Sequence, residues 1–329
     1  MRFLKSEAGA IVLWLVASLF AAALLTPYLY DAGKALAASA EVKDYPGIIE
    51  SVAGSAQRAK PDRFFSRALL ISALALMPVL IRRVKRIPPR EDADRYALRK
   101  TGWPQRLAHL GTGILIGAAC LGVLALVLHL TGAATSNGSG ITAGKLFSKA
   151  FLPALGAGVI EELVFRGLLL GLWLRACSLW TAWIGSSVMF SFVHFLKPPP
   201  GMEIADPGAW HSGLEILGST LGHFSNPAFF ITEFSTLAFL GLVLAWCRTR
   251  TFSLWLPIGL HAGLVFALKG FSLTSNLNYG STMHPWFIGA DLKSGIFPLL
   301  ALGLCFLLCT VAIRFLPGNG NETISNPNQ

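Results

Sequence analysis

The chain carries little charge for its length. Of its 329 residues, 53% are hydrophobic and only 13% are charged, and the mean hydropathy is +0.59. Soluble domains are about a quarter charged, so this composition excludes an ordinary soluble protein. The apolar residues gather in stretches long enough to cross a bilayer as helices. The sequence therefore predicts an all-α, polytopic integral membrane protein.

Strand-like segments of alternating hydrophobicity and internal repeats are also missing, which argues against a membrane barrel and against a repeat architecture. We expect instead a helical bundle of about eight transmembrane helices around a polar intramembrane cavity. The predicted spans are 9–30, 66–83, 107–130, 150–174, 178–196, 229–247, 252–269 and 295–315.

Cysteine is scarce, and its spacing is uninformative about metals. None of the five cysteines forms a CxxC pair, so neither a disulfide framework nor a thiolate zinc site is expected. Cys305 and Cys309 share a helix face, for which small apolar packing is the simplest interpretation.

Positive charge is concentrated in one loop. Nine of the lysines and arginines lie between residues 82 and 106, and they contribute much of the formal charge of +10. The positive-inside rule makes this loop cytoplasmic, together with both chain termini. We expect the loop to contact anionic lipid headgroups. Nucleic acid is not expected as a partner, because the loop is short and also contains Glu91, Asp92 and Asp94. The first span is interpreted as a retained anchor rather than a cleaved signal peptide.

Three charged residues interrupt an apolar span: Glu161, Glu162 and Arg166. Each costs roughly 2.5–3.5 kcal/mol at the centre of a membrane helix, so the three need partners inside the protein. In a helix Glu162 and Arg166 are four residues apart on one face and can neutralise each other. Glu161 points about 100° away and is left for proton transfer. A helix-packing ion network or an ion pathway is the alternative.

Two histidines lie in later apolar spans. His194 follows Phe190 by four residues, and His261 lies between Gly259 and Gly263, a spacing that permits close helix approach. Each histidine alone is more typical of an interhelical hydrogen bond than of catalysis.

Together these motifs are more specific. Glu161-Glu162-x-x-x-Arg166, then Phe190-x-x-x-His194, then His261 resembles the CAAX prenyl protease and bacteriocin-processing family of intramembrane proteases, which includes the type II CAAX endopeptidases. The resemblance covers roughly residues 147–270. It departs from the family at Val265, where members usually carry Asn or Asp.

The resemblance implies an endopeptidase that cuts a membrane-associated protein or peptide, in a bacterial inner (plasma) membrane. Glu161 would be the general base, His194 would help to hold the water, and His261 would donate to the oxyanion. Glu162 and Arg166 would brace them, and no cofactor is implied. The alternative is a zinc site at Glu161, His194 and His261, because two His and one Glu form a known catalytic zinc set.

The domain organisation follows from these assignments. We expect N-terminal membrane helices in 1–146, a protease-like core in 147–270, a C-terminal membrane helix in 271–316, and a disordered tail in 317–329. Two other functions stay open: a catalytically silent scaffold or immunity factor, which Val265 favours, and a transporter. A transporter fold would show paired halves with broken helices, and the sequence shows no such symmetry.

Overall fold

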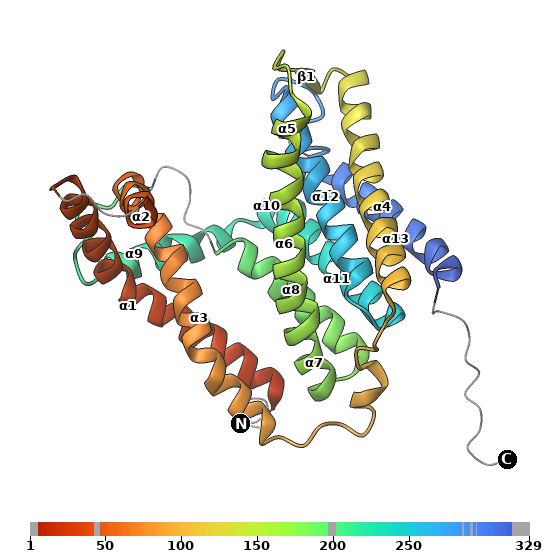
Figure 1. Cartoon of the computed structure of the whole chain (residues 1–329), viewed down its shortest axis with the longest axis horizontal. Helices are drawn as coiled ribbons and strands as arrows, with labels where there is room; N and C mark the ends of the chain where they lie inside the picture. The colour runs from red at the N-terminus through yellow and green to blue at the C-terminus, as the bar shows by residue number, and fades with distance from the viewer. Residues whose placement is uncertain are drawn as a thin grey trace. The chain divides into compact units, whose positions relative to one another are not determined.

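The structure is a computed structural model that describes residues 6–42, 47–196, 202–284, 286–289, 292–293 and 295–317. The predicted disordered tail lies outside these residues from position 318 onward. Contacts divide the chain into two units (Figure 1): unit 1 comprises residues 1–89 and 192–229, and unit 2 comprises residues 90–191 and 230–329.

Unit 1 is built from long helices of the N-terminal region and the segment after α8. Its elements are α1 (Glu7–Val42), α2 (Gly47–Arg58), α3 (Pro61–Lys85), α9 (Ser212–Gly222), η5 (His223–Ser225) and α10 (Pro227–Phe229). The indole of Trp14 on α1 donates to the carbonyl of Ala73 on α3, at 3.1 Å. α9 packs so closely on α1 that a methyl group at Gly213 would lie 1.9 Å from the carbonyl oxygen of Ala23. The described residues of segment 31–65 are mostly helical, in α1, α2 and the start of α3.

Unit 2 carries the remaining elements. They are η2 (Ala93–Tyr96), α4 (Trp103–Leu130), β1 (Ala134–Ser136), α5 (Ala143–Leu146), η3 (Phe147–Phe151), α6 (Leu152–Glu162), η4 (Leu163–Leu169), α7 (Leu170–Ala176), α8 (Leu179–His194, which continues into unit 1), η6 (Phe230–Phe234), α11 (Ser235–Thr251), α12 (Trp255–Thr274), β2 (Ser275–Leu277) and α13 (Ile296–Phe315). The two short strands pair antiparallel, with Ala134 opposite Leu277. Helix dominates both units, as the sequence predicted.

Glycines set the central helix pair of unit 2, α4 and α12. A methyl group at Gly259 would lie 2.1 Å from the carbonyl oxygen of Leu110, and one at Gly263 would lie 2.3 Å from that of Ile114. Methyl groups at the opposing Gly113 and Gly117 would each lie 2.5 Å from a backbone atom of Leu260 on α12. The small-residue motifs on both helices therefore face each other and bring the two backbones into contact.

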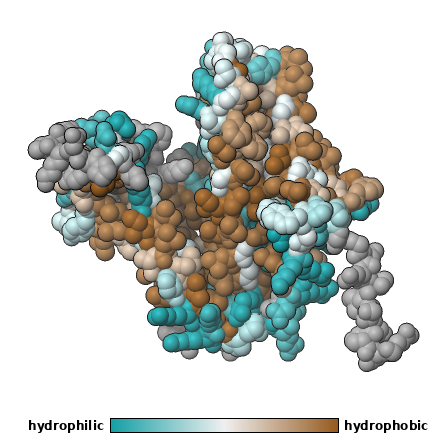
Figure 2. Space-filling view, in the orientation of Figure 1, coloured by the Kyte–Doolittle hydropathy of each residue, from teal (hydrophilic) through white to brown (hydrophobic). Residues whose placement is uncertain are grey.

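Six helices of the described residues are long and apolar enough to cross a membrane. Spans 150–174 and 178–196, predicted in addition, are helical but do not meet this length criterion as single α-helices. The first is divided by the π-helical segments η3 and η4, and the second corresponds to the 16-residue α8. Hydrophobic surface runs along the helices (Figure 2), and large apolar side chains on it are exposed, among them Leu115, Leu130, Leu300 and Leu307. The protein is an integral membrane protein.

Four of the five cysteines, all of which are free, meet inside unit 2. Cys120 on α4 is a neighbour of Cys305 on α13, and Cys247 on α11 is a neighbour of Cys309 on α13. All four are buried. They fill the contacts of α13 with its two neighbours, in agreement with the small apolar packing expected for Cys305 and Cys309.

Candidate active site

The two adjacent glutamates lie where the helix changes its geometry. Glu161 and Glu162 end α6, and Arg166 lies in the π-helical segment η4 that follows without a break. A π-helical turn within an α-helix is rare and is frequent at functional sites. The sequence argument assumed an ordinary α-helical turn, but Glu162 and Arg166 still meet across this wider one.

Arg166 is held on three sides in the interior of unit 2. Its Nη1 donates to Oε1 of Glu162 at 2.9 Å, with the two side chains 3% and 0% exposed. Its Nη2 donates to the carbonyl oxygen of Gly241 on α11 at 3.3 Å. The guanidinium also lies 4.2 Å from the ring centre of Phe190 on α8, within the range of a cation–π contact. These contacts fix the guanidinium among three helices.

The same oxygen of Glu162 also contacts His261, which is 99 residues away in sequence. The distance from Oε1 to Nδ1 of His261 is 2.8 Å, and the histidine is 4% exposed. An ionised carboxylate can only accept hydrogen bonds, so Nδ1 is the nitrogen that carries the proton. Nε2 is therefore the ring nitrogen left to face a reacting group, as an acceptor in the neutral ring and a donor in the protonated one.

Glu161 lies on the other side of this histidine. Its Oε2 is 3.8 Å from Nε2 of His261, and its side chain is 31% exposed, whereas that of Glu162 is fully buried. The two adjacent carboxylates thus have different surroundings. One is enclosed by Arg166 and His261, and the other is next to the available nitrogen and reaches solvent-accessible surface.

Close packing of α6 on α12 places the glutamates beside His261. A methyl group at Gly158, one turn before Glu162, would lie 3.1 Å from the carbonyl oxygen of Ile258. It would also lie 3.2 Å from Cβ of Ala262, the residue next to His261. Phe190 packs edge-on against the imidazole, with ring centres 6.1 Å apart. Backbone contact on one side and an aromatic ring on another restrict the position of the histidine.

His194, the other predicted histidine, is the last residue of α8 and is partly buried. It belongs to unit 1, whereas Glu161, Glu162, Arg166 and His261 belong to unit 2. The cluster assembled above is therefore that of unit 2 alone.

Val265 lies one turn beyond His261 on α12. It lines a separate pocket, with Leu268 and Lys269 of the same helix. No group of three or more His, Cys, Asp or Glu side chains in the described part of the chain is arranged to hold a metal ion.

Sequence reasoning missed several partners in this cluster. The Glu162–His261 contact, the Gly241 carbonyl and the position of Phe190 over Arg166 were not predicted. The four-residue spacing of Phe190 and His194 was a usable signal for the ring, because it places Phe190 beside a candidate residue. Nothing in the sequence marks the Gly241 carbonyl, since every residue has one.

Comparison with known proteins agrees with the motifs. The family described as type II CAAX prenyl endopeptidase Rce1-like matches residues 143–267, a segment that includes the five candidate residues. No curated protein and no solved structure matches the chain. This match over residues 143–267 supports the family that the motifs indicated.

Proposed function

We propose that this protein is an intramembrane endopeptidase that hydrolyses a peptide bond in a membrane-associated protein or peptide. The observation that supports it best is the arrangement of two carboxylates around one imidazole. Glu162 is enclosed and engages Nδ1 of His261, while Glu161 lies 3.8 Å from Nε2 and is partly exposed. The match of residues 143–267 to a peptidase family supports the same reaction.

The proposed roles follow the chemistry of hydrolysis. Glu161 takes a proton from water while the water oxygen attacks the carbonyl carbon, and His261 in its protonated form donates from Nε2 to the developing oxyanion. The tetrahedral intermediate then collapses. The C–N bond breaks, and the proton passes to the leaving nitrogen, so that the products are a carboxylate and an amine. His194 is assigned to holding the water.

Glu162 and Arg166 act through His261 rather than on the substrate. The carboxylate orients the imidazole by accepting a hydrogen bond from Nδ1, and the guanidinium holds that carboxylate in place. Loss of either partner would leave an unmatched charge in this buried position, which is costly in free energy. This explains why the motif contains two glutamates when one arginine neutralises only one of them.

The substitution Glu161→Gln tests the proposal. It keeps the size of the side chain and removes the proton acceptor, so turnover should fall at least ~100-fold, the lower end for loss of a general base. Cleavage would be measured in proteoliposomes with a library of membrane-anchored reporter peptides.

Glu215→Gln is the matched control. Glu215 lies on α9 with 48% of its side chain exposed, paired with His211, the residue that precedes this helix. It should leave turnover unchanged. Near-normal turnover of the Glu161→Gln protein would remove Glu161 as the base.

A catalytically silent scaffold or immunity factor is the second candidate function. Val265 favours it, because an apolar side chain occupies the position where the resembling family usually has a hydrogen-bonding one. The same assay separates the two functions, since a silent protein would fold and show no cleavage with any reporter.

Location and orientation belong to the proposal as well. We place the protein in a bacterial inner membrane with both termini in the cytoplasm. Of the nine basic residues in 82–106, all but Arg106 are exposed, as contact with anionic headgroups requires. Arg90 is partly neutralised, because it pairs with Asp92 at 3.0 Å, and this hydrogen bond lowers the pKa of the Asp92 carboxyl.

A further inference from the structure

Three lysines from different parts of unit 2 surround one pocket of about 370 Å³. Lys149 belongs to η3, Lys269 to α12, and Lys293 to the segment before α13. Val265, Leu268, Ser272 and Leu273 complete the described lining. Among the lining residues that the structure describes, three are lysines and none is acidic.

The position of the pocket relative to the basic loop makes three lysines there unexpected. The pocket lies near β2, which pairs with the strand that follows the C-terminal end of α4. The basic loop 82–106 leads into the N-terminal end of α4. The 28 residues of α4 span about 42 Å, which is more than the hydrocarbon thickness of a bilayer. The pocket and the loop therefore belong to opposite membrane surfaces. Lysine and arginine are depleted on the surface opposite to a basic loop, yet three lysines share one pocket here.

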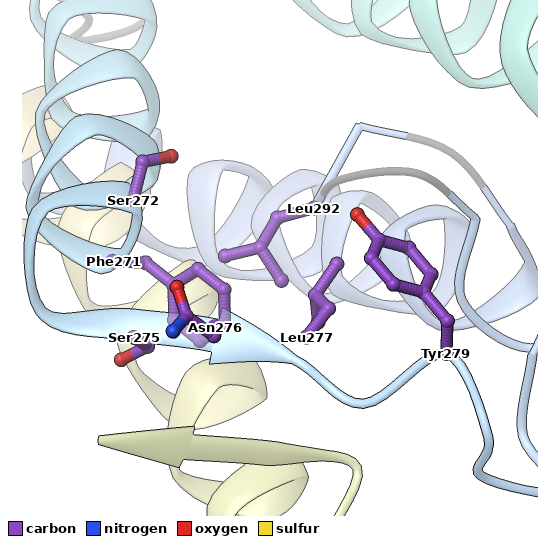
Figure 3. A pocket seen from close by; sticks show the side chains of 7 residues that line it. All are labelled: Phe271, Ser272, Ser275, Asn276, Leu277, Tyr279 and Leu292. Atoms are coloured by element: carbon purple, nitrogen blue, oxygen red, sulfur yellow. The ribbon is translucent and has the colours of Figure 1, made fainter. Parts of the chain in front are cut away.

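A second pocket of about 300 Å³ adjoins the first and supplies uncharged polar groups. Ser272 lines both pockets, and Leu292 of the second is next to Lys293 of the first. Figure 3 shows the side chains of Ser275, Asn276 and Tyr279 around this space, with Leu277 and Leu292 between them. The three lysines of the first pocket therefore lie next to the hydroxyl and amide groups of the second pocket.

Aromatic apolar surface flanks the lysines. Phe147, 52% exposed, stacks on Phe151 with ring centres 5.5 Å apart, and Phe151 packs edge-on against Phe266 of α12. These rings belong to the same turns as Lys149 and Val265. The lysines, the hydroxyl groups and the apolar rings are therefore neighbours in one part of unit 2.

We propose that the two pockets bind the headgroup of an anionic glycerophospholipid whose headgroup carries hydroxyl groups. The phosphodiester lies between Lys149, Lys269 and Lys293, because a phosphate is the anion that several converging ammonium groups attract at a membrane surface. The headgroup hydroxyls reach the polar groups of Figure 3, and the acyl chains follow the phenylalanines. This site is separate from the Glu162–His261 cluster and does not require that the protein cleave anything.

The test uses the full-length protein purified in detergent and titrated with phosphatidylglycerol in mixed micelles. Bound lipid is counted by native mass spectrometry, and thermal unfolding is followed in parallel. Each lysine near an anionic group contributes about fivefold in affinity, so replacing all three by Gln should weaken binding about 100-fold. Replacing all three by Arg should keep most of it.

A triple variant in unit 1, away from the pocket and from the basic loop, is the matched control, with the exposed residues Arg58, Lys60 and Arg63 replaced by Gln. It removes the same charge and should retain binding of one phosphatidylglycerol within about threefold. Size-exclusion profiles and unfolding temperatures without lipid show whether each variant is folded.

Four results would overturn the proposal. The first is wild-type affinity in the lysine-to-Gln variant. The second is equal binding of phosphatidylcholine, because the lysines would then not select an anionic headgroup. The third is equal stabilisation by inorganic phosphate or glycerol 3-phosphate, which would make this a site for a free anion. The fourth is displacement of the lipid by a peptide through its C-terminal carboxylate, which would make it a substrate site.

Discussion

The buried pair of Glu162 and Arg166 gives the sharpest quantitative expectation. Arg166→Ala leaves the carboxylate of a fully buried side chain with His261 as its remaining described hydrogen-bond partner, and Glu162→Gln leaves a guanidinium that is 3% exposed without its counter-charge. Removing one partner of such a pair typically costs ~3–5 kcal/mol. Arg166→Ala should lie at the upper end, because it also loses the Gly241 carbonyl and the Phe190 ring.

The double variant should be less damaging than the two losses added together. It contains no unmatched charge, so the coupling free energy should be about 2–3 kcal/mol, within the range found for residues in one buried network. The four proteins would be unfolded in mixed micelles by titration with a denaturing detergent. The exposed pair Arg90 and Asp92, at the similar distance of 3.0 Å, is the control and should show no measurable coupling.

Cleavage kinetics distinguish a positioning role of Glu162 from a purely structural one. If Glu162 orients His261, Glu162→Gln should lower kcat much more than it changes KM, and Glu162→Asp should restore part of it. Additivity of the two single losses within about 0.5 kcal/mol would show that the pair contributes no coupling and would refute this reasoning.

Three further predictions concern other parts of the molecule. Val265→Asn should leave turnover unchanged, because Val265 lines the lysine pocket and not the Glu162–His261 cluster; a rate raised toward the ~2.7–4 kcal/mol of one oxyanion donor would show that this position reaches the reacting carbonyl. Chelators should leave cleavage intact if Glu161 acts directly on water, whereas one equivalent of zinc together with chelator-sensitive, zinc-rescued cleavage would convert Glu161, His194 and His261 into ligands. Gly259→Ala should destabilise the protein and lower turnover, because the added methyl would lie 2.1 Å from a carbonyl oxygen of α4, while Gly122→Ala, where nothing lies within 4 Å, should do neither.

The local features of this protein could be predicted from its sequence. Low charge and long apolar stretches require membrane helices, because an unsatisfied backbone is too costly in lipid. The Glu162–Arg166 pair is also local, since residues four apart meet on a helix whatever surrounds it. The resemblance to the CAAX prenyl protease and bacteriocin-processing family was recognised for the same reason, through motifs that each lie within one helix.

Interhelical partners were decided only by tertiary structure. Glu162 and His261 are 99 residues apart, and a helical period says which face a residue occupies but not which helix it meets. Several GxxxG pairs occur among the 33 glycines of the sequence. Tertiary packing brings those on α4 and α12 into backbone contact, whereas a methyl group at Gly171 would meet nothing within 4 Å. The same packing gathered four cysteines and three lysines whose sequence positions gave no sign of proximity. The local sequence determines where helices form and which residues share a helix face. The packing of those faces decides which charged residues share a site.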